Sequence, residues 1–156
     1  AVSAAEFLRV DRDAVIAFAT ACKHAGVAHF EVLSSVVADA HARSLYLRAK
    51  GELRDALVAL AFERLSVFQP SMILTPTNRY GIGQGPLQAV WPWLDPLLGG
   101  SRRKFRGIPV QALGAAMAAN LSTQGNGFES LHWPEFVALA ARASAGATGA
   151  NPGVQR

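Results

Sequence analysis

The chain has 156 residues, of which 51% are hydrophobic and 17% charged, a balance typical of a folded globular domain. No apolar run reaches the roughly 18 residues that a membrane span needs, and the first residues lack the pattern of a signal peptide. The single cysteine, Cys22, excludes an internal disulfide and favours a reducing compartment, so we expect a cytoplasmic protein.

The formal net charge is +4, and much of the excess lies in one short run, SRRKFRG, at residues 101–107. We interpret this run as a solvent-exposed loop rather than a nucleic-acid surface, although a cofactor phosphate or an acidic substrate could use the same charges. The four histidines lack the paired spacing of metal ligands, so we expect no metal site.

The first half of the chain alternates between helical and strand patterns. Residues 11–25 have apolar positions at helical spacing, with Asp11 able to cap the start, and a second helix is predicted over residues 42–61. Gly51 inside that helix should weaken it by about 1 kcal/mol relative to alanine. Strands are predicted over residues 27–35 and 64–70. Helix, strand, helix and strand with short connections indicate a parallel sheet with helices on its faces.

The periodicity fails over residues 71–105, which hold many prolines and glycines together with Trp91 and Trp93. We interpret this segment as a substrate-side lobe. A helix over residues 108–121 and then a strand and helix over residues 127–143 follow. We expect one domain over residues 1–145 and a disordered tail over residues 146–156.

A doubly wound nucleotide-binding sheet begins with a strand, a Gly-rich turn and a helix, and nothing before Asp11 supplies them. The run YGIGQGP at residues 80–86 does not lie between a strand and a helix, so we interpret it as a loop. The predicted fold class is therefore α/β, as the C-terminal part of a doubly wound, Rossmann-like parallel sheet.

Four side chains around the second helix suggest chemistry. Ser34 and Ser35 follow a predicted strand, and ligands bind beyond the carboxyl ends of strands in such sheets. Tyr46 and Lys50 share a helix face one turn apart. A free phenol titrates near pH 10, and an adjacent ammonium favours its ionised form. Together these groups indicate a carbonyl/alcohol redox site, although each pair alone occurs often for structural reasons.

The runs GVAHFEVLSS, YLRAKGE and RLSVFQPSMIL resemble the short-chain dehydrogenase/reductase superfamily, and more narrowly its atypical subgroup of human HIV Tat-interacting proteins. The resemblance implies that Tyr46 is the acid/base, that Lys50 binds the nicotinamide ribose and tunes the tyrosine, and that Ser35 positions the substrate. Ser34 is the alternative serine, since the register of the pair is open, and it is also a candidate for cofactor contact.

The family's Pro-Gly turn, whose backbone meets the nicotinamide amide, corresponds to Pro70, Ser71, Met72 and Ile73, with serine in place of glycine. Many members carry an asparagine where this chain has Asp11, for which we expect helix capping instead. The resemblance implies NADP or NAD as cofactor, with NADP favoured, and predicts that binding needs an N-terminal half absent from this sequence.

The function that the resemblance implies is an NAD(P)-dependent oxidoreductase that transfers hydride between nicotinamide and a small carbonyl or alcohol substrate. The alternative is a non-catalytic NAD(P)-binding regulatory or scaffold protein. Intact Ser35, Tyr46 and Lys50 favour the enzyme, whereas the missing Gly-rich half and Asp11 favour the alternative. The substrate and the oligomeric state stay open.

Overall fold

The computed structural model describes residues 3–75 and 99–149. The chain forms two compact units: Ala1–Gln69 with Gln124–Leu131 make the first, and Pro70–Thr123 with His132–Arg156 make the second. The expectation of one domain over residues 1–145 remains a prediction. The two units are described in turn.

The first unit begins with a long helical segment that contains one irregular turn. It comprises α1 (Ala4–Leu8), the π-helical turn η1 (Arg9–Asp13) and α2 (Ala14–His24). Ser3 caps the start, because its side chain accepts a hydrogen bond from the Glu6 N–H. The prediction that Asp11 caps a helix beginning at residue 11 is wrong: Ala, Glu, Leu and Arg extend the helix upstream, where all four are good helix formers.

A three-stranded parallel sheet forms the centre of the first unit, in the order β1 (His29–Leu33), β2 (Arg64–Phe68) and β5 (Gly127–Leu131). The crossover from β1 to β2 is made by α3 (Leu45–Ala59). This arrangement confirms the α/β class and the parallel, Rossmann-like sheet.

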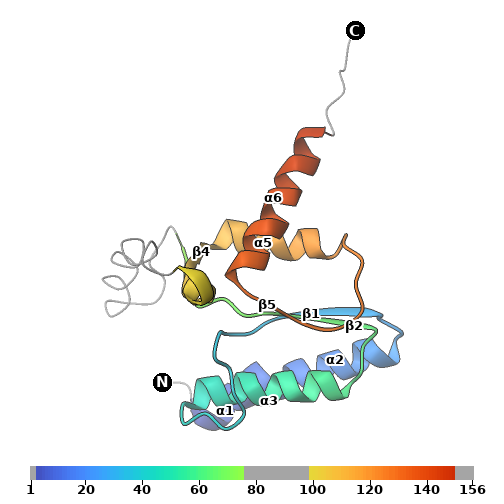
Figure 1. The fold of residues 1–156 in the computed structure, drawn as a ribbon. Helices are drawn as coiled ribbons and strands as arrows, with labels where there is room; N and C mark the ends of the chain where they lie inside the picture. The colour runs from blue at the N-terminus through green and yellow to red at the C-terminus, as the bar shows by residue number, and fades with distance from the viewer. Residues whose placement is uncertain (1–2, 76–98, 150–156) are drawn as a thin grey trace. The chain divides into compact units, whose positions relative to one another are not determined.

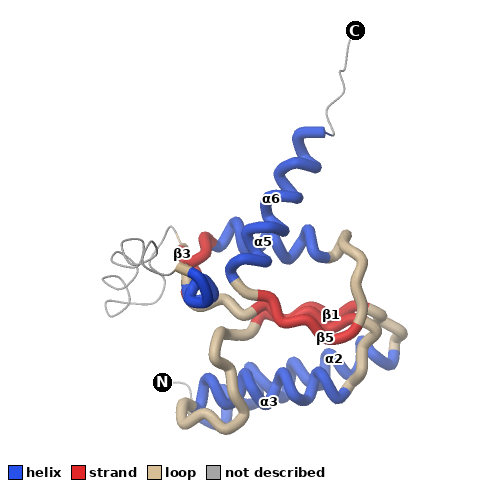
Figure 2. Tube along the Cα trace, viewed as in Figure 1, coloured by secondary structure: helices blue, strands red, loops and turns tan. Residues whose placement is uncertain are grey.

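The helices α1, α2 and α3 cover one face of this sheet (Figure 1). In Figure 2 the strands of the sheet, drawn in red, lie above α2 and α3. Phe30 stacks on Phe62, with ring centroids 5.0 Å apart. Alternate residues of each strand point to this face, because successive side chains in a strand point to opposite sides. The apolar core of the unit consists of Ala19, Phe30, Leu53, Leu57, Phe62, Leu65 and Val67.

The second unit pairs two short strands and two helices. In it β3 (Met72–Leu74) pairs in parallel with β4 (Gly107–Pro109), and the 3₁₀ helix η3 (Gly100–Phe105) precedes β4. The helices α5 (Val110–Asn120) and α6 (Trp133–Gly149) cross and pack together (Figure 1). The buried apolar side chains of these two helices include Leu113, Ala116, Phe136 and Leu139.

Two features of this unit differ from expectation. Strands of three residues are too short to show a period, so the sequence did not reveal β3 or β4. Helix α6 reaches Gly149, although we expected the tail to begin at residue 146. The glycine-containing run 80–86, Trp91 and Trp93 lie outside the described residues. Within residues 3–75 and 99–149, none of the helices is both long and apolar enough to cross a bilayer.

Candidate functional site

Tyr46 and Lys50 lie on the first two turns of α3, which begins where the Ser44 side chain accepts a hydrogen bond from the Leu47 N–H. The Lys50 Nζ atom is 5.9 Å from the centroid of the Tyr46 ring. Tyr46 is 46% exposed, whereas the Lys50 side chain is only 13% exposed. The pair therefore presents a phenol to solvent with a largely covered ammonium group beside it.

The Lys50 ammonium also forms an ion pair across to the first helical segment. Its Nζ atom lies 3.4 Å from Oδ1 of Asp11, which belongs to the π turn η1. In this turn the Ala14 N–H donates to the Arg9 carbonyl, five residues earlier rather than four. Turns of this kind recur at functional sites. Asp11, which we had expected to cap a helix, instead holds the lysine of the candidate site.

The two serines at the end of β1 differ in their surroundings. The Ser34 N–H donates to the Phe68 carbonyl at 2.7 Å and so extends the ladder between β1 and β2. The Ser34 hydroxyl is buried and has no hydrogen-bond partner among the described residues. Ser35 donates instead to the Val36 carbonyl at 3.3 Å. In the described part of the chain, no hydrogen bond joins either serine to Tyr46.

The loop that follows these serines is fixed against α3. The Asp39 N–H donates to the Leu47 carbonyl at 3.2 Å, and Arg54 donates to the Ala38 carbonyl at 3.0 Å. A side chain at Gly51 would collide with the backbone of Asp39 and Ala40. The interpretation of Gly51 as a mild weakness in the helix is therefore wrong. The missing Cβ allows the serine-bearing loop to lie directly on the helix that carries Tyr46 and Lys50.

A shallow hollow of about 460 Å³ lies beside Tyr46. Phe7 and Tyr46 form an aromatic pair in its wall, with ring centroids 6.3 Å apart and planes tilted by 40°. The lining residues come from the start of the first helical segment and the start of α3, and most of the lining is apolar. Among the residues that the structure describes, they are Ser3, Ala4, Phe7, Leu45 and Tyr46.

The remaining cofactor candidates, Pro70, Ser71, Met72 and Ile73, belong to the second unit. Met72 and Ile73 are residues of β3 and stand opposite Gly107 and Ile108 of β4. Their assignment as cofactor-binding residues remains a prediction.

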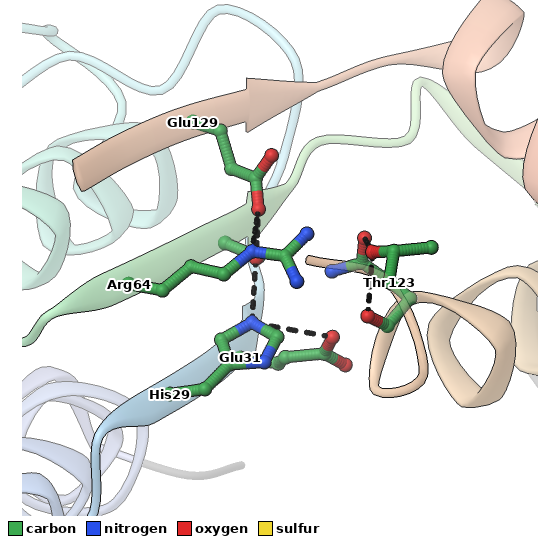
Figure 3. Close-up of polar contacts among 7 residues, drawn as sticks. His29, Glu31, Arg64, Thr123 and Glu129 are labelled. Atoms are coloured by element: carbon green, nitrogen blue, oxygen red, sulfur yellow. Dashed lines mark hydrogen bonds and ion pairs between the residues drawn. The ribbon is translucent and has the colours of Figure 1, made fainter. Parts of the chain in front are cut away.

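A second polar cluster lies on the face of the three-stranded sheet that the core does not use (Figure 3). The Glu129 carboxylate accepts hydrogen bonds from Ser66 at 2.5 Å and from Arg64 at 2.6 Å. The Ser66 oxygen lies 2.8 Å from Nε2 of His29, and Nε2 is 3.6 Å from Glu31. Because the Ser66 hydroxyl proton points to Glu129, Nε2 of His29 must be the donor to Ser66.

Both titratable ends of this cluster have shifted pKa values. Burial lowers the pKa of His29, and the nearby Arg64 charge lowers it further against the opposing effect of Glu129. Burial acts to raise the pKa of Glu129. The hydrogen bonds from Ser66 and Arg64, together with the electrostatic effects of Arg64 and His29, outweigh burial and hold this pKa below its ordinary value. The cluster is thus a carboxylate whose ionised form Ser66 and Arg64 stabilise, linked through Ser66 to a histidine whose neutral form burial favours.

From the sequence we gave His29 no role beyond the expectation of no metal site, and we missed the rest of this cluster. The available signal was the alternation of polar and apolar residues in HFEVL, RLSVF and GFESL. Glu31, Ser66 and Glu129 stand opposite one another in the sheet register. Polar residues at every second position in three neighbouring strands predict a polar sheet face.

Comparison with known proteins gives relatives but no family model that matches the chain. Protein HTATIP2 of Rattus norvegicus is 36% identical over 132 residues, which cover 78% of this chain and 48% of that protein. Protein FMP52-2, mitochondrial, of Scheffersomyces stipitis is 38% identical over 78 residues, or 50% of this chain and 34% of its own length. Protein FMP52, mitochondrial, of Debaryomyces hansenii is 27% identical over 126 residues, which cover 78% of this chain and 54% of that protein. The chain thus spans about half the length of the first and third of these relatives.

Proposed function

We propose that this relative of HTATIP2 and the FMP52 proteins is an NAD(P)-dependent oxidoreductase of the atypical short-chain dehydrogenase/reductase type. The observation that carries the proposal is the placement of Tyr46 and Lys50 on one face of α3, with the ammonium group 5.9 Å from the ring centroid. The serine-bearing strand end is held on the same helix through Gly51. The FMP52 relatives are named as mitochondrial proteins, and a cytoplasmic location for this chain remains a prediction.

The residues around Tyr46 fit a nicotinamide dinucleotide, which supplies or accepts the hydride when it is bound. An ammonium group has three N–H donors, and Asp11 is the acceptor that the described residues offer to Lys50. The Ser34 hydroxyl has no partner among the described residues but is buried, so a cofactor would bond to it only where the chain that covers it moves aside. Ser34, Tyr46 and Lys50 would hold the nicotinamide end, with NADP favoured over NAD.

The roles of the three side chains follow from their chemistry. In carbonyl reduction, the Tyr46 hydroxyl gives its proton to the carbonyl oxygen while hydride reaches the carbonyl carbon, and the product is an alcohol. Lys50 stabilises the negative charge that remains on the Tyr46 oxygen. Ser35 donates a hydrogen bond to the same substrate oxygen, and in alcohol oxidation each step runs in reverse.

A non-catalytic NAD(P)-binding regulator is the second candidate, and one observation favours it. The Asp11 carboxylate lies 3.4 Å from Lys50 and offsets part of the positive charge that a proton-transferring tyrosine needs. In that case dinucleotide binding would be the function and Tyr46 would carry no chemistry. Both candidates bind the dinucleotide, but only the enzyme converts a substrate. Measurement of turnover therefore separates them.

The test is a fluorescence titration of the full-length protein that carries this chain with NADPH and NADH, followed by a carbonyl-reduction assay, for wild type, Lys50→Met and Lys23→Met. Lys23 is the matched control, because it is a half-exposed lysine of α2 that donates to the Ala61 carbonyl. We expect Lys50→Met to weaken dinucleotide binding by about tenfold, or 1.4 kcal/mol, and Lys23→Met to leave it unchanged. Full-length wild-type protein that binds neither dinucleotide would contradict both candidates.

A further inference from the structure

We infer that the hollow beside Tyr46 takes the uncharged, apolar part of the carbonyl substrate, and that Phe7 and Leu45 select for it. The inference rests on the proposed function, because Tyr46 is both the proposed proton donor and a wall of the hollow. It names a substrate class that the Tyr46–Lys50 pair alone does not specify: ketones or aldehydes that carry an aromatic or aliphatic group without a charge.

The chemistry of the described lining residues favours an uncharged ligand group. None of the five described residues that line the hollow carries a charge, and three of them, Ala4, Phe7 and Leu45, are wholly apolar. The Ser3 hydroxyl accepts the Glu6 N–H at 3.1 Å as the helix cap and keeps its own hydrogen to donate. The Ser3 and Tyr46 hydroxyls are therefore the polar side-chain groups of the described lining, which suits a molecule with one carbonyl oxygen and an apolar remainder.

The basic residues on the surrounding helices are also neutralised. Arg12 donates to Glu52, Lys50 lies against Asp11, and Arg9 lies 4.0 Å from Glu6. On α3, Arg48 approaches the same Glu52 at 4.0 Å. Each of these cations has an acidic neighbour, with Glu52 serving both Arg12 and Arg48, so an anionic substrate would have to compete with these carboxylates for them.

The size and shape of the hollow favour a flat ring. Its volume of about 460 Å³ falls within the range of about 300–1,000 Å³ that small-molecule sites occupy. Phe7 and Tyr46 are 6.3 Å apart at 40°, so a ligand ring can pack against the face of one and the edge of the other. Phe7 is therefore the specificity-determining residue that we single out.

Ligand-observed NMR titration tests the inference without any need for cofactor. The probes are acetophenone and its charged analogue 4-acetylbenzoate, measured on wild type, Phe7→Ala, Phe7→Leu and Phe18→Ala. Phe18 is the matched control, because it is a phenylalanine of the same helical segment that is 65% exposed and does not line the hollow. Circular dichroism checks that each variant is folded, and Phe7→Leu keeps apolar volume at the site if Phe7→Ala unfolds.

We expect acetophenone to bind wild type and Phe18→Ala equally, to bind Phe7→Leu more weakly, and to bind Phe7→Ala about tenfold more weakly. We expect 4-acetylbenzoate to bind wild type at least about tenfold more weakly than acetophenone. Equal affinity of wild type and Phe7→Ala, equal affinity for both probes, or no binding of acetophenone would overturn the inference.

A parallel NADPH-consumption assay with acetophenone separates this inference from the proposed function. Phe7-dependent binding with turnover supports both. Phe7-dependent binding without turnover supports the ligand class of the hollow and contradicts the oxidoreductase. Turnover that Phe7→Ala leaves unchanged supports the oxidoreductase and overturns the inference.

Discussion

Asp11 and Lys50 form an ion pair of 3.4 Å between two helical segments that are 39 positions apart in the chain. The ion pair holds the Lys50 ammonium group beside Tyr46. The negative charge of Asp11 also offsets part of the positive charge of Lys50. If Lys50 acts by stabilising the Tyr46 anion, then Asp11 moderates that effect. The strength of this moderation is measurable.

Asp11→Asn should remove the opposing charge while it keeps the shape of the side chain. The unopposed ammonium should stabilise negative charge on the Tyr46 oxygen more, so we expect the carbonyl-reduction rate to rise by up to about tenfold. Unfolding free energy should drop by less than about 1 kcal/mol, because the Asp11 side chain is 40% exposed.

Asp13→Asn is the matched control for this change. It removes a charge from the same π turn, where Asp13 accepts a hydrogen bond from Arg12, without touching Lys50. A carbonyl-reduction rate that Asp11→Asn leaves identical to wild type would show that the ion pair has no part in the chemistry.

Gly51→Ala should destabilise the protein, against the usual preference of helices for alanine. The added Cβ would collide with the backbone of Asp39 and Ala40, so the loop after Ser35 would have to move. We expect a loss of about 1–3 kcal/mol in urea unfolding, as for other overpacked sites.

The control for Gly51→Ala is Gly114→Ala, a helical glycine in α5 whose added Cβ would meet nothing within 4 Å. Alanine there should leave stability unchanged or raise it by up to about 1 kcal/mol. If both variants were equally stable, the close packing of the loop on α3 would be refuted.

The polar cluster on the sheet should make stability depend on pH. In the unfolded chain His29 takes up a proton around pH 6.5, whereas its pKa in the folded protein is lower because of burial and the Arg64 charge. The unfolded state therefore binds more protons below about pH 6.5, and unfolding free energy should fall as the pH falls through this range. Glu129, whose folded pKa is also lowered, should add a further loss below about pH 4.5.

Urea unfolding at pH 7.5, 6.5, 5.5 and 4.5 checks this prediction. His29→Gln should flatten the dependence between pH 7.5 and 5.5, while His41→Gln, at an exposed position, should keep it. Parallel curves for wild type and His29→Gln would mean that another group titrates.

Local patterns predicted the parallel sheet because each of its strands is flanked by clear signals. Pro70 follows β2, and Gly26 precedes β1. The pairing of Tyr46 with Lys50 was predictable for the same reason, since residues four apart share a helix face. Spacing along one element was enough for each of these predictions.

Contacts between elements were not predictable in this way. The sequence pattern suggested Asp11 as a helix cap, but the structure shows that Ser3 caps the helix. The sequence pattern also does not indicate the extra residue of the π turn. The sequence alone suggested that Gly51 weakens the helix, but the structure shows that the backbone of Asp39 packs against Gly51. Both errors came from judging a residue by its own helix when its partner lies on another element.

The most direct test of the central claim is the rate of NADPH-dependent carbonyl reduction by Tyr46→Phe, with NADPH affinity measured on the same samples. The substitution removes one oxygen atom from a side chain that is 46% exposed, so the fold should be preserved. The account predicts a loss of at least about 100-fold in turnover, the usual contribution of a general acid, with NADPH affinity close to that of wild type. Full turnover by Tyr46→Phe would contradict the assignment of Tyr46 as the proton donor.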